Sequence, residues 1–241
     1  METQARSNRR SGRKWLRIIV IICLFCLISG LLVKCDWRFP VIPEEAITAN
    51  KQHDNSTLEE WYLIVVNRWN EIPLDYSVTL TVLSNGQKVD SRIYPCLQEM
   101  FDDAKSEGIF PFVREGFRTK EEQQAIFDER IQAYIDAGNS EELSRELAEE
   151  WVAVPGTSEH QLGISVDINA DISKSTSEDV YMWLAENAYH YGFILRYPQG
   201  KENITGTAYE PWHYRYVGIE AAKDIYEQGL CLEEYVKQVI G

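Results

Sequence analysis

An uncharged run at residues 18–33 (IIVIICLFCLISGLLV) limits what the first part of this 241-residue chain can form. With Trp15 and Leu16 beside it, the run approaches the ~20 residues that a helix needs to cross a bilayer. Arg and Lys residues precede it, which predicts a cytoplasmic N-terminus and an external chain from residue 36 onward. We therefore expect four segments: a basic cytoplasmic tail at 1–17, a transmembrane anchor at 18–34, an extracytoplasmic tether at 35–58 and a globular domain at 59–241.

A cleaved signal peptide is the alternative interpretation of this run. The apolar stretch is long for that purpose, and only Ser29-Gly30 offers a weak cleavage site. Cys35 suggests a lipoprotein, but Lys34 stands where a small residue should precede a lipidated cysteine. These features favour an uncleaved anchor, and cleavage stays open as an alternative.

The charge of the chain is unevenly distributed. The whole sequence carries a net charge of −14, whereas residues 1–35 hold seven basic residues and one acidic residue. The remainder therefore carries about −20, and a strongly acidic body does not suit a phosphate backbone. The composition argues against nucleic acid as a partner and favours a peptide or small-molecule substrate.

Two cysteines, Cys96 and Cys231, lie in the expected globular domain. They could pair in an oxidising compartment, but two cysteines do not make a disulfide framework. The single CxxC spacing, Cys23 to Cys26, lies within the uncharged run and not in the expected globular domain, so a cysteine-based zinc site is not expected. The pairing of Cys96 with Cys231 is left open at this point.

Helical and extended patterns mix along 59–241 without regular alternation, which predicts the α+β class. The clearest helix start is the pair Thr119 and Glu122, which fits a capping box. Asn139 and Glu142 stand in the same relation before the next helix. The patterns predict strands at 61–66, 78–83 and 109–113, and helices at 91–106, 120–137, 139–151, 178–190 and 219–227, the last of these being the final helix.

Two of the four histidines lie in unusual surroundings, His160 in SEHQLGISVD and His213 in YEPWHY. With Asp167, they make a plausible zinc site of two histidines and one carboxylate. Catalytic zinc takes three protein ligands and leaves the fourth position for water. Each pair taken alone is a weak signal, since a core histidine or a turn aspartate is common, and the combination carries the prediction.

Glu210 stands three residues before His213 and has a role beside such a metal. A carboxylate there can take a proton from the attacking water and return it to the leaving amine. On a regular strand, residues three apart face opposite sides. Pro211 disfavours a regular ladder, so we expect a kink that lets Glu210 and His213 converge.

The combined motifs resemble the VanY-type D-alanyl-D-alanine carboxypeptidases, which are related to lysostaphin and hedgehog domains. The resemblance rests on SxHxxGxxxD from Ser158 to Asp167 and ExxH from Glu210 to His213. It extends to GFRT at 116–119, to YGFILRYP at 191–198 and to most of 59–241. Phe117 and Thr119 depart from the family's Tyr and Ser, but neither change removes a metal ligand or the base.

The resemblance implies a central, mainly antiparallel sheet with flanking helices and one Zn²⁺ on His160, Asp167 and His213. It implies that Glu210 is the general base and that Arg118 stabilises the charge on the scissile carbonyl oxygen. In the same way it implies substrate contacts from three further residues: Ser158, Gln123 and Tyr197.

We therefore expect a zinc-dependent D,D-carboxypeptidase at the bacterial cell membrane, which removes the terminal D-Ala from peptidoglycan stem peptides by attack of a zinc-bound water. Such an activity is compatible with a role in glycopeptide resistance. An L,D-carboxypeptidase acting on tetrapeptide stems is the nearest alternative within the resemblance, and a cytoplasmic D,D-dipeptidase would not need an anchor. A wall-peptide-binding module without catalysis is the alternative from a different class.

Overall fold

The computed structural model describes residues 61–240, which lie within one compact unit, Glu44–Gly241. The predicted basic tail, transmembrane anchor and tether therefore lie outside the described residues. Within 61–240, none of the helices combines the length and the apolar character needed to cross a bilayer.

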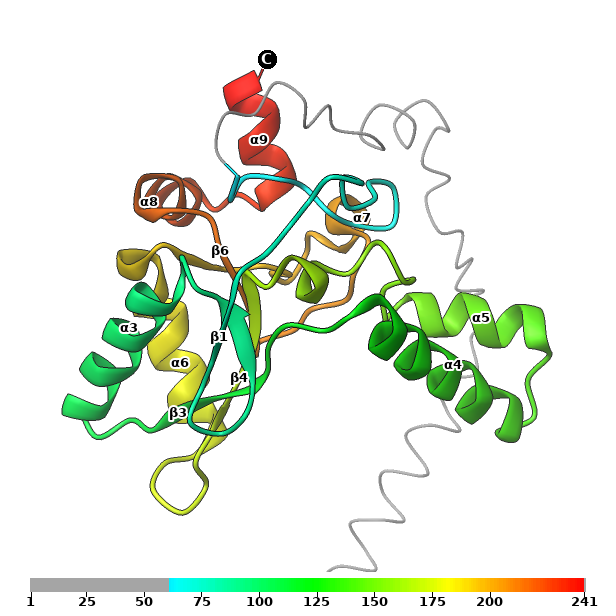
Figure 1. Ribbon diagram of the computed structural model, residues 1–241, viewed down its shortest axis with the longest axis horizontal. Coiled ribbons are helices and arrows are strands. Elements are labelled where there is room, and N and C mark those ends of the chain that lie inside the picture. The colour runs from blue at the N-terminus through cyan, green and yellow to red at the C-terminus, as the bar shows by residue number, and fades with distance from the viewer. Residues whose placement is uncertain (1–60, 241) are drawn as a thin grey trace, which may run out of the picture. The chain divides into compact units, whose positions relative to one another are not determined.

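Two antiparallel sheets form the framework (Figure 1). The smaller is the hairpin of β1 (Leu80–Val82) and β2 (Lys88–Asp90). The larger has the strand order β3-β4-β6-β5. Its strands are β3 (Pro111–Glu115), β4 (Ser165–Ala170), β5 (Phe193–Leu195) and β6 (His213–Tyr216).

The helices flank these sheets, as an α+β fold requires. In Figure 1, α3 (Tyr94–Ser106) and α6 (Ser177–Asn187) lie on one side of the larger sheet, and α4 (Lys120–Asp136) and α5 (Glu141–Glu149) lie on the other. The remaining helices are α7 (Glu202–Thr205), α8 (Ile219–Gln228), α9 (Leu232–Ile240) and the short 3₁₀ helices η2 (Glu159–Leu162) and η3 (Ala188–Tyr191).

Strand β4 separates the hydrophobic core from the functional face. Val166, Ile168 and Ala170 are buried in the main core, which also contains apolar side chains of α3 and α6. Since successive strand residues point to opposite faces, Ser165 and Asp167 point away from that core. The alternation of the sequence thus places one set of side chains in the core and the other at the site described below.

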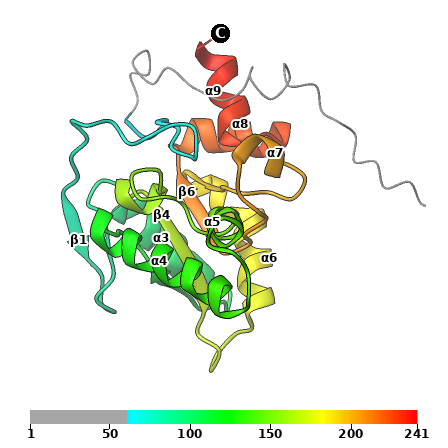
Figure 2. The same cartoon turned by 90° about the vertical axis from the view of Figure 1, so that its right-hand side faces the viewer.

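Helices α4 and α5 form a hairpin with a small core of its own, made by Phe127, Ile131, Ala148 and Val152. Figure 2 shows this pair facing the viewer, in front of the sheet. The predicted capping box is present, because Thr119 accepts from the Glu122 backbone N–H and Glu122 accepts from that of Thr119. This hairpin supplies one wall of the functional cavity.

Three predictions about secondary structure are wrong. Residues 61–66 form no strand; their apolar side chains pack in the core, while the carbonyl oxygens of Tyr62 and Ile64 accept from Arg215. The cap of α5 is Ser140 and not Asn139, because the Ser140 hydroxyl accepts from the Leu143 N–H. Helix α8 is not the last helix, since the chain turns at Gly229, where φ is +64°, and continues as α9.

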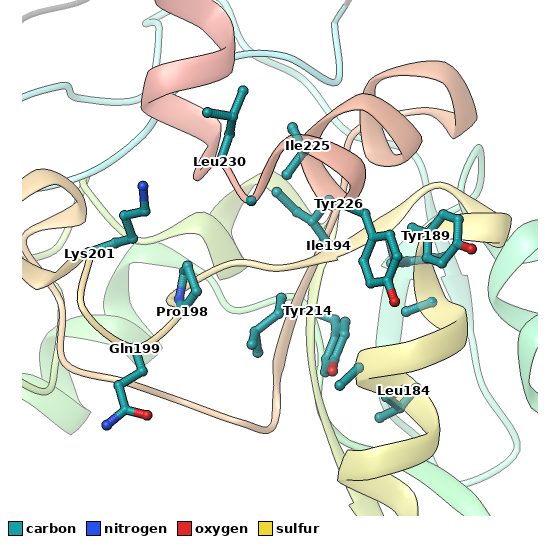
Figure 3. A pocket seen from close by; sticks show the side chains of 15 residues that line it. Leu184, Tyr189, Ile194, Pro198, Gln199, Lys201, Tyr214, Ile225, Tyr226 and Leu230 are labelled. Carbon is teal, nitrogen blue, oxygen red and sulfur yellow. The ribbon is translucent and has the colours of Figure 1, made fainter.

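An apolar cavity of about 250 Å³ lies between α6, η3, α8 and the segment after β5 (Figure 3). Tyr214 lines it, whereas its neighbour His213 lines the functional cavity, as the alternation along β6 requires. The question of the two cysteines is also answered, since Cys96 and Cys231 are free thiols.

Candidate metal centre and active site

The pairing of β4 with β6 brings Asp167 and His213 together. The two residues are directly opposite each other in the antiparallel register, so their side chains leave the same face of the sheet. The Nδ1 atom of His213 lies 2.9 Å from Oδ1 of Asp167. Residues 46 positions apart in the sequence therefore become neighbours through strand register alone.

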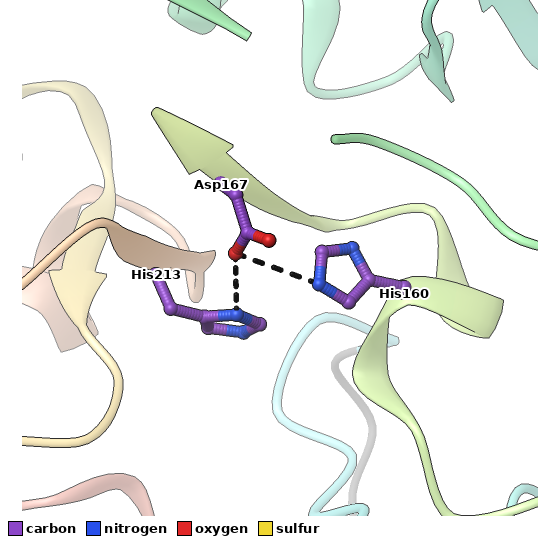
Figure 4. A group of neighbouring side chains, drawn as sticks. All are labelled: His160, Asp167 and His213. Atoms are coloured by element: carbon purple, nitrogen blue, oxygen red, sulfur yellow. Dashed lines mark hydrogen bonds and ion pairs between the residues drawn. The ribbon is translucent and has the colours of Figure 1, made fainter. Parts of the chain in front are cut away.

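His160 reaches the same point from η2, the short helix that precedes β4. Its Nδ1 atom lies 2.8 Å from the carbonyl oxygen of Gly116. Because a carbonyl only accepts, Nδ1 must carry the proton, and Nε2 is left with its lone pair. That Nε2 atom lies 3.6 Å from Oδ1 of Asp167 (Figure 4).

One ligand atom from each of these three residues lies within 4.8 Å of the others. Two imidazole nitrogens and one carboxylate oxygen form a donor set that suits zinc. Burial lowers the pKa of His160, which favours the neutral ring that a metal needs. His160, Asp167 and His213 therefore fit a single zinc ion, with His160 oriented by a backbone carbonyl as such ligands usually are.

Glu210 joins this cluster through a turn. The His213 N–H donates to the Glu210 carbonyl, which closes a turn over residues 210–213 immediately before β6. The Glu210 Oε2 atom then lies 3.7 Å from Nδ1 of His213. The kink expected at Pro211 is confirmed. Burial raises the pKa of the Glu210 carboxyl to about 7, against the attraction of the His213 ring.

Charge inside the cluster is balanced locally. Burial opposes ionisation of Asp167, but His160 and His213 outweigh it and hold the Asp167 pKa well below its usual range. Burial also opposes the charged form of His213, yet Asp167, Glu159 and Glu210 raise its pKa to about 9. The carboxylates of the cluster thus stabilise a positive charge at this point, as the site of a metal ion must.

Arg118 lies between β3 and α4 and points toward the cluster. Its Nη2 atom is 3.8 Å from Oδ2 of Asp167, and its Nη1 donates to Oε1 of Gln123 at 2.8 Å. Gln123 is only 1% exposed, and its Nε2 donates to the Ala153 carbonyl at 2.7 Å. Both groups of the Gln123 amide are therefore engaged within the protein, where they fix the direction of Arg118.

The eight residues predicted from the sequence line one cavity of about 240 Å³. Ser158 and Tyr197 are buried in its wall, and the Tyr197 ring lies against His213 with 4.9 Å between ring centroids. The roles of Ser158, Gln123 and Tyr197 toward a substrate stay predictions. Arg130 and Trp151 also line this cavity, and the sequence patterns did not point to them.

A fully buried ion network supports the cluster from behind, and sequence reasoning missed it. Glu159 Oε1 accepts from Arg196 and Arg215, each at 2.7 Å, and Arg196 is also bound by Glu233. The second Glu159 oxygen lies 3.7 Å from Nε2 of His213. An available signal was Arg196 inside the apolar segment FILRY, because an arginine there needs a buried acid.

Comparison with known proteins supports one family. The model of the family described as "VanY: D-alanyl-D-alanine carboxypeptidase" matches residues 86–219. A D-alanyl-D-alanine carboxypeptidase of Enterococcus faecalis (strain ATCC 700802 / V583) is 56% identical over 196 residues, which cover 80% of this chain and 72% of that protein. The family model's match at 86–219 includes the cluster and both of the motifs that hold it.

Solved structures agree. A mutant of the vancomycin resistance D,D-pentapeptidase VanY from a VanB-type cassette, in complex with Zn(II), is 58% identical with a TM-score of 0.72, covering 73% of this chain and 99% of that one. VanYB in complex with D-alanine-D-alanine has the same identity and TM-score, covering 74% and 98%.

The LdcB LD-carboxypeptidase is more distant, at 35% identity and a TM-score of 0.61, covering 72% of this chain and 84% of that one. The sequence motifs, the fold and the arrangement of the cluster thus lead to the same result. This chain belongs to the VanY family of D-alanyl-D-alanine carboxypeptidases.

Proposed function

We propose that this protein is a zinc-dependent D,D-carboxypeptidase that removes the terminal D-Ala from peptidoglycan stem peptides. One observation carries the proposal: Glu210 lies 3.7 Å from His213, inside a cavity where His160, Asp167 and His213 converge. The Zn(II) and D-alanine-D-alanine bound to related VanY structures support the choice of metal and substrate.

Zinc would be held by His160, Asp167 and His213. When bound, it would polarise the scissile carbonyl and make water a better nucleophile near neutral pH. The protein contributes the fixed directions of the ligands, because Gly116 orients the His160 ring and the β4–β6 register fixes Asp167 against His213.

Glu210 is placed to move the proton. As a carboxylate, it takes a proton from the attacking water, and it then gives that proton to the amine of the departing D-Ala. A raised pKa suits this role, because the carboxylate then accepts a proton more readily than an exposed glutamate does. Burial in the cavity wall is the physical cause of that raised pKa.

Arg118 provides the second charge effect. Its guanidinium faces the cavity and is held by Gln123, so it needs no reorganisation when negative charge develops on the carbonyl oxygen. A fixed donor of this kind commonly contributes 10²–10³ in rate, or about 3–4 kcal/mol. We assign Gln123 the positioning of Arg118, and we assign Ser158 and Tyr197 contacts with the peptide.

Mass analysis of two synthetic stems tests the proposal. The full-length protein with zinc is incubated with a pentapeptide that ends in D-Ala-D-Ala and with a tetrapeptide that ends in one D-Ala. Loss of one D-Ala from the pentapeptide, abolished in Glu210→Ala, is the expected result. Loss only from the tetrapeptide would establish the L,D alternative, which the likeness to LdcB favours. Binding of both peptides without cleavage would indicate the non-catalytic module.

We also propose that residues 18–34 anchor the protein in the bacterial cell membrane, with residues 1–17 in the cytoplasm. The apolar run and the basic residues before it support this arrangement. It would bring the catalytic domain to the external stem peptides, where D,D activity could contribute to glycopeptide resistance. Extraction from membranes by detergent alone, and removal of the domain by external protease, are the expected results. Release by high salt would contradict the anchor.

A further inference from the structure

We infer that Arg130, which lines the catalytic cavity together with Trp151, binds a carboxylate of the stem peptide two or three residues upstream of the scissile bond. The inference rests on the proposed function and adds a specificity determinant to it. The ligand chemistry is a free α-carboxylate within the peptide, the group that remains when a glutamate is joined to the next residue through its γ-carboxyl.

Helix α4 forms one wall of the catalytic cavity and presents a row of side chains to it. Gln123, Ile126 and Arg130 line the catalytic cavity and are spaced i, i+3 and i+7, so they share one face of the helix. Gln123 holds Arg118, the residue assigned above to the scissile carbonyl oxygen. Arg130 lies seven residues further along, or about 10 Å at 1.5 Å per residue.

That distance selects an upstream group of the substrate. An extended peptide advances about 3.3–3.6 Å per residue, so about 10 Å corresponds to roughly three residues. The terminal carboxylate lies only one residue from the scissile bond, which is too near. A group two or three residues upstream lies at the right distance, given the reach of the arginine side chain.

Arg130 is available for such a contact. It is exposed and, among residues 61–240, makes no ion pair with an acidic side chain. Its helical neighbours at i±3 and i±4 are Phe127, Ala133, Ile126 and Tyr134, so none of them is an acid. The rest of the α4–α5 hairpin is rich in Asp and Glu, so Arg130 places a positive charge at the cavity on an otherwise acidic element.

Trp151 supplies the other half of the wall. It comes after the C-cap residue of α5, lines the same cavity, and remains 46% exposed despite its size. An indole offers a flat apolar surface for a peptide, while a guanidinium can bind a carboxylate through two parallel hydrogen bonds. Together the two side chains match a short peptide segment that carries a negative charge.

Two pentapeptide stems that differ in one group test the inference. One carries the free α-carboxylate at its γ-linked glutamate, and the other carries the carboxamide. Full-length Arg130→Ala is compared with the wild type and with Arg145→Ala, which removes the same charge from the same hairpin. Arg145 lies over the Phe127 ring and does not line the cavity, so it is the matched control.

On the carboxylate peptide, Arg130→Ala should lose about 5-fold in kcat/KM. The loss should appear mainly as a higher KM, because the contact stabilises the ground state and the transition state equally. The carboxamide peptide should lose less than about 2-fold, and Arg145→Ala should treat the two peptides as the wild type does. Trp151→Ala should raise KM for both peptides, and an unchanged KM would overturn the role of the indole.

If Arg130→Ala lost the same kcat/KM on both peptides, or lost none on either, the role of Arg130 would be overturned. An equal loss on both peptides is also what binding of the terminal carboxylate by Arg130 would produce. Failure of the wild type to cleave either peptide would contradict the proposed function instead. In that event, the dissociation constants of the two peptides are measured for Glu210→Ala and for the double variant Glu210→Ala/Arg130→Ala. Weaker binding of the carboxylate peptide alone in the double variant would still support the role of Arg130.

Discussion

Glu159 Oε1 accepts a hydrogen bond from Arg196 Nε at 2.7 Å, and neither side chain has any exposure to solvent. The same carboxylate also binds Arg215 and lies behind His213. Burial works against the charge of Glu159, but the two guanidinium groups outweigh it and hold its pKa well below the usual range. Behind His213, the sheet thus packs against a buried network of charged side chains and not against an apolar core.

We expect Glu159→Gln to lower the free energy of unfolding by about 3–5 kcal/mol, because removing one partner leaves buried guanidinium groups without full compensation. Urea denaturation followed by tryptophan fluorescence measures this change. Lys201→Ala, which breaks the partly exposed pair with Glu234, is the control and should cost less than ~1 kcal/mol. Similar losses in both variants would show that the buried network is not specially stabilising.

Zinc affinity should rise with pH, about tenfold per unit between pH 6.5 and 9. In the chelator-treated protein, the carboxylates around His213 raise its pKa to about 9. The free energy of folding that this proton contributes is therefore fully present below pH 6.5 and is lost as the pH rises through 9. Zinc must displace that proton from the ring. Competition with a chromophoric chelator at several pH values measures the slope, and a flat profile would contradict the prediction.

Arg118→Met should lower kcat by about 10²–10³ while leaving the zinc content unchanged, because the role proposed for the guanidinium is to stabilise developing charge and not to bind the metal. Gln123→Ala should lower kcat by only about 10-fold, since it acts through the orientation of Arg118. Steady-state kinetics and metal analysis of both variants provide the comparison. A larger effect in Gln123→Ala than in Arg118→Met would reverse the assigned roles.

Gly116→Ala should weaken zinc binding by about 10–100-fold, because a Cβ there would lie 2.2 Å from the Lys88 carbonyl oxygen and would displace the carbonyl that orients His160. Gly86→Ala is the matched control, since Gly86 has φ +87° and open space around it. Its strained backbone should reduce stability without changing zinc affinity. Equal zinc affinities in the two variants would contradict this account.

The sequence predicted a metal site because the candidate ligands lie in short motifs. His160 and Asp167 share one segment, and Glu210 and His213 share another. Local rules also gave the capping box at Thr119, which depends only on side chains three residues apart. The strand predicted at 61–66 failed because tertiary contacts overrode local propensity: the Arg215 guanidinium takes carbonyl oxygens that a strand partner would otherwise use.

The sequence by itself therefore determined which residues were candidates for the site, since donor chemistry and close spacing are local properties. Only the tertiary structure decided how they meet. The register that pairs Asp167 with His213, the buried Glu159 network behind them and the entry of Arg130 and Trp151 into the cavity each join segments far apart in the chain. Such contacts depend on strand pairing and packing, which no short motif records.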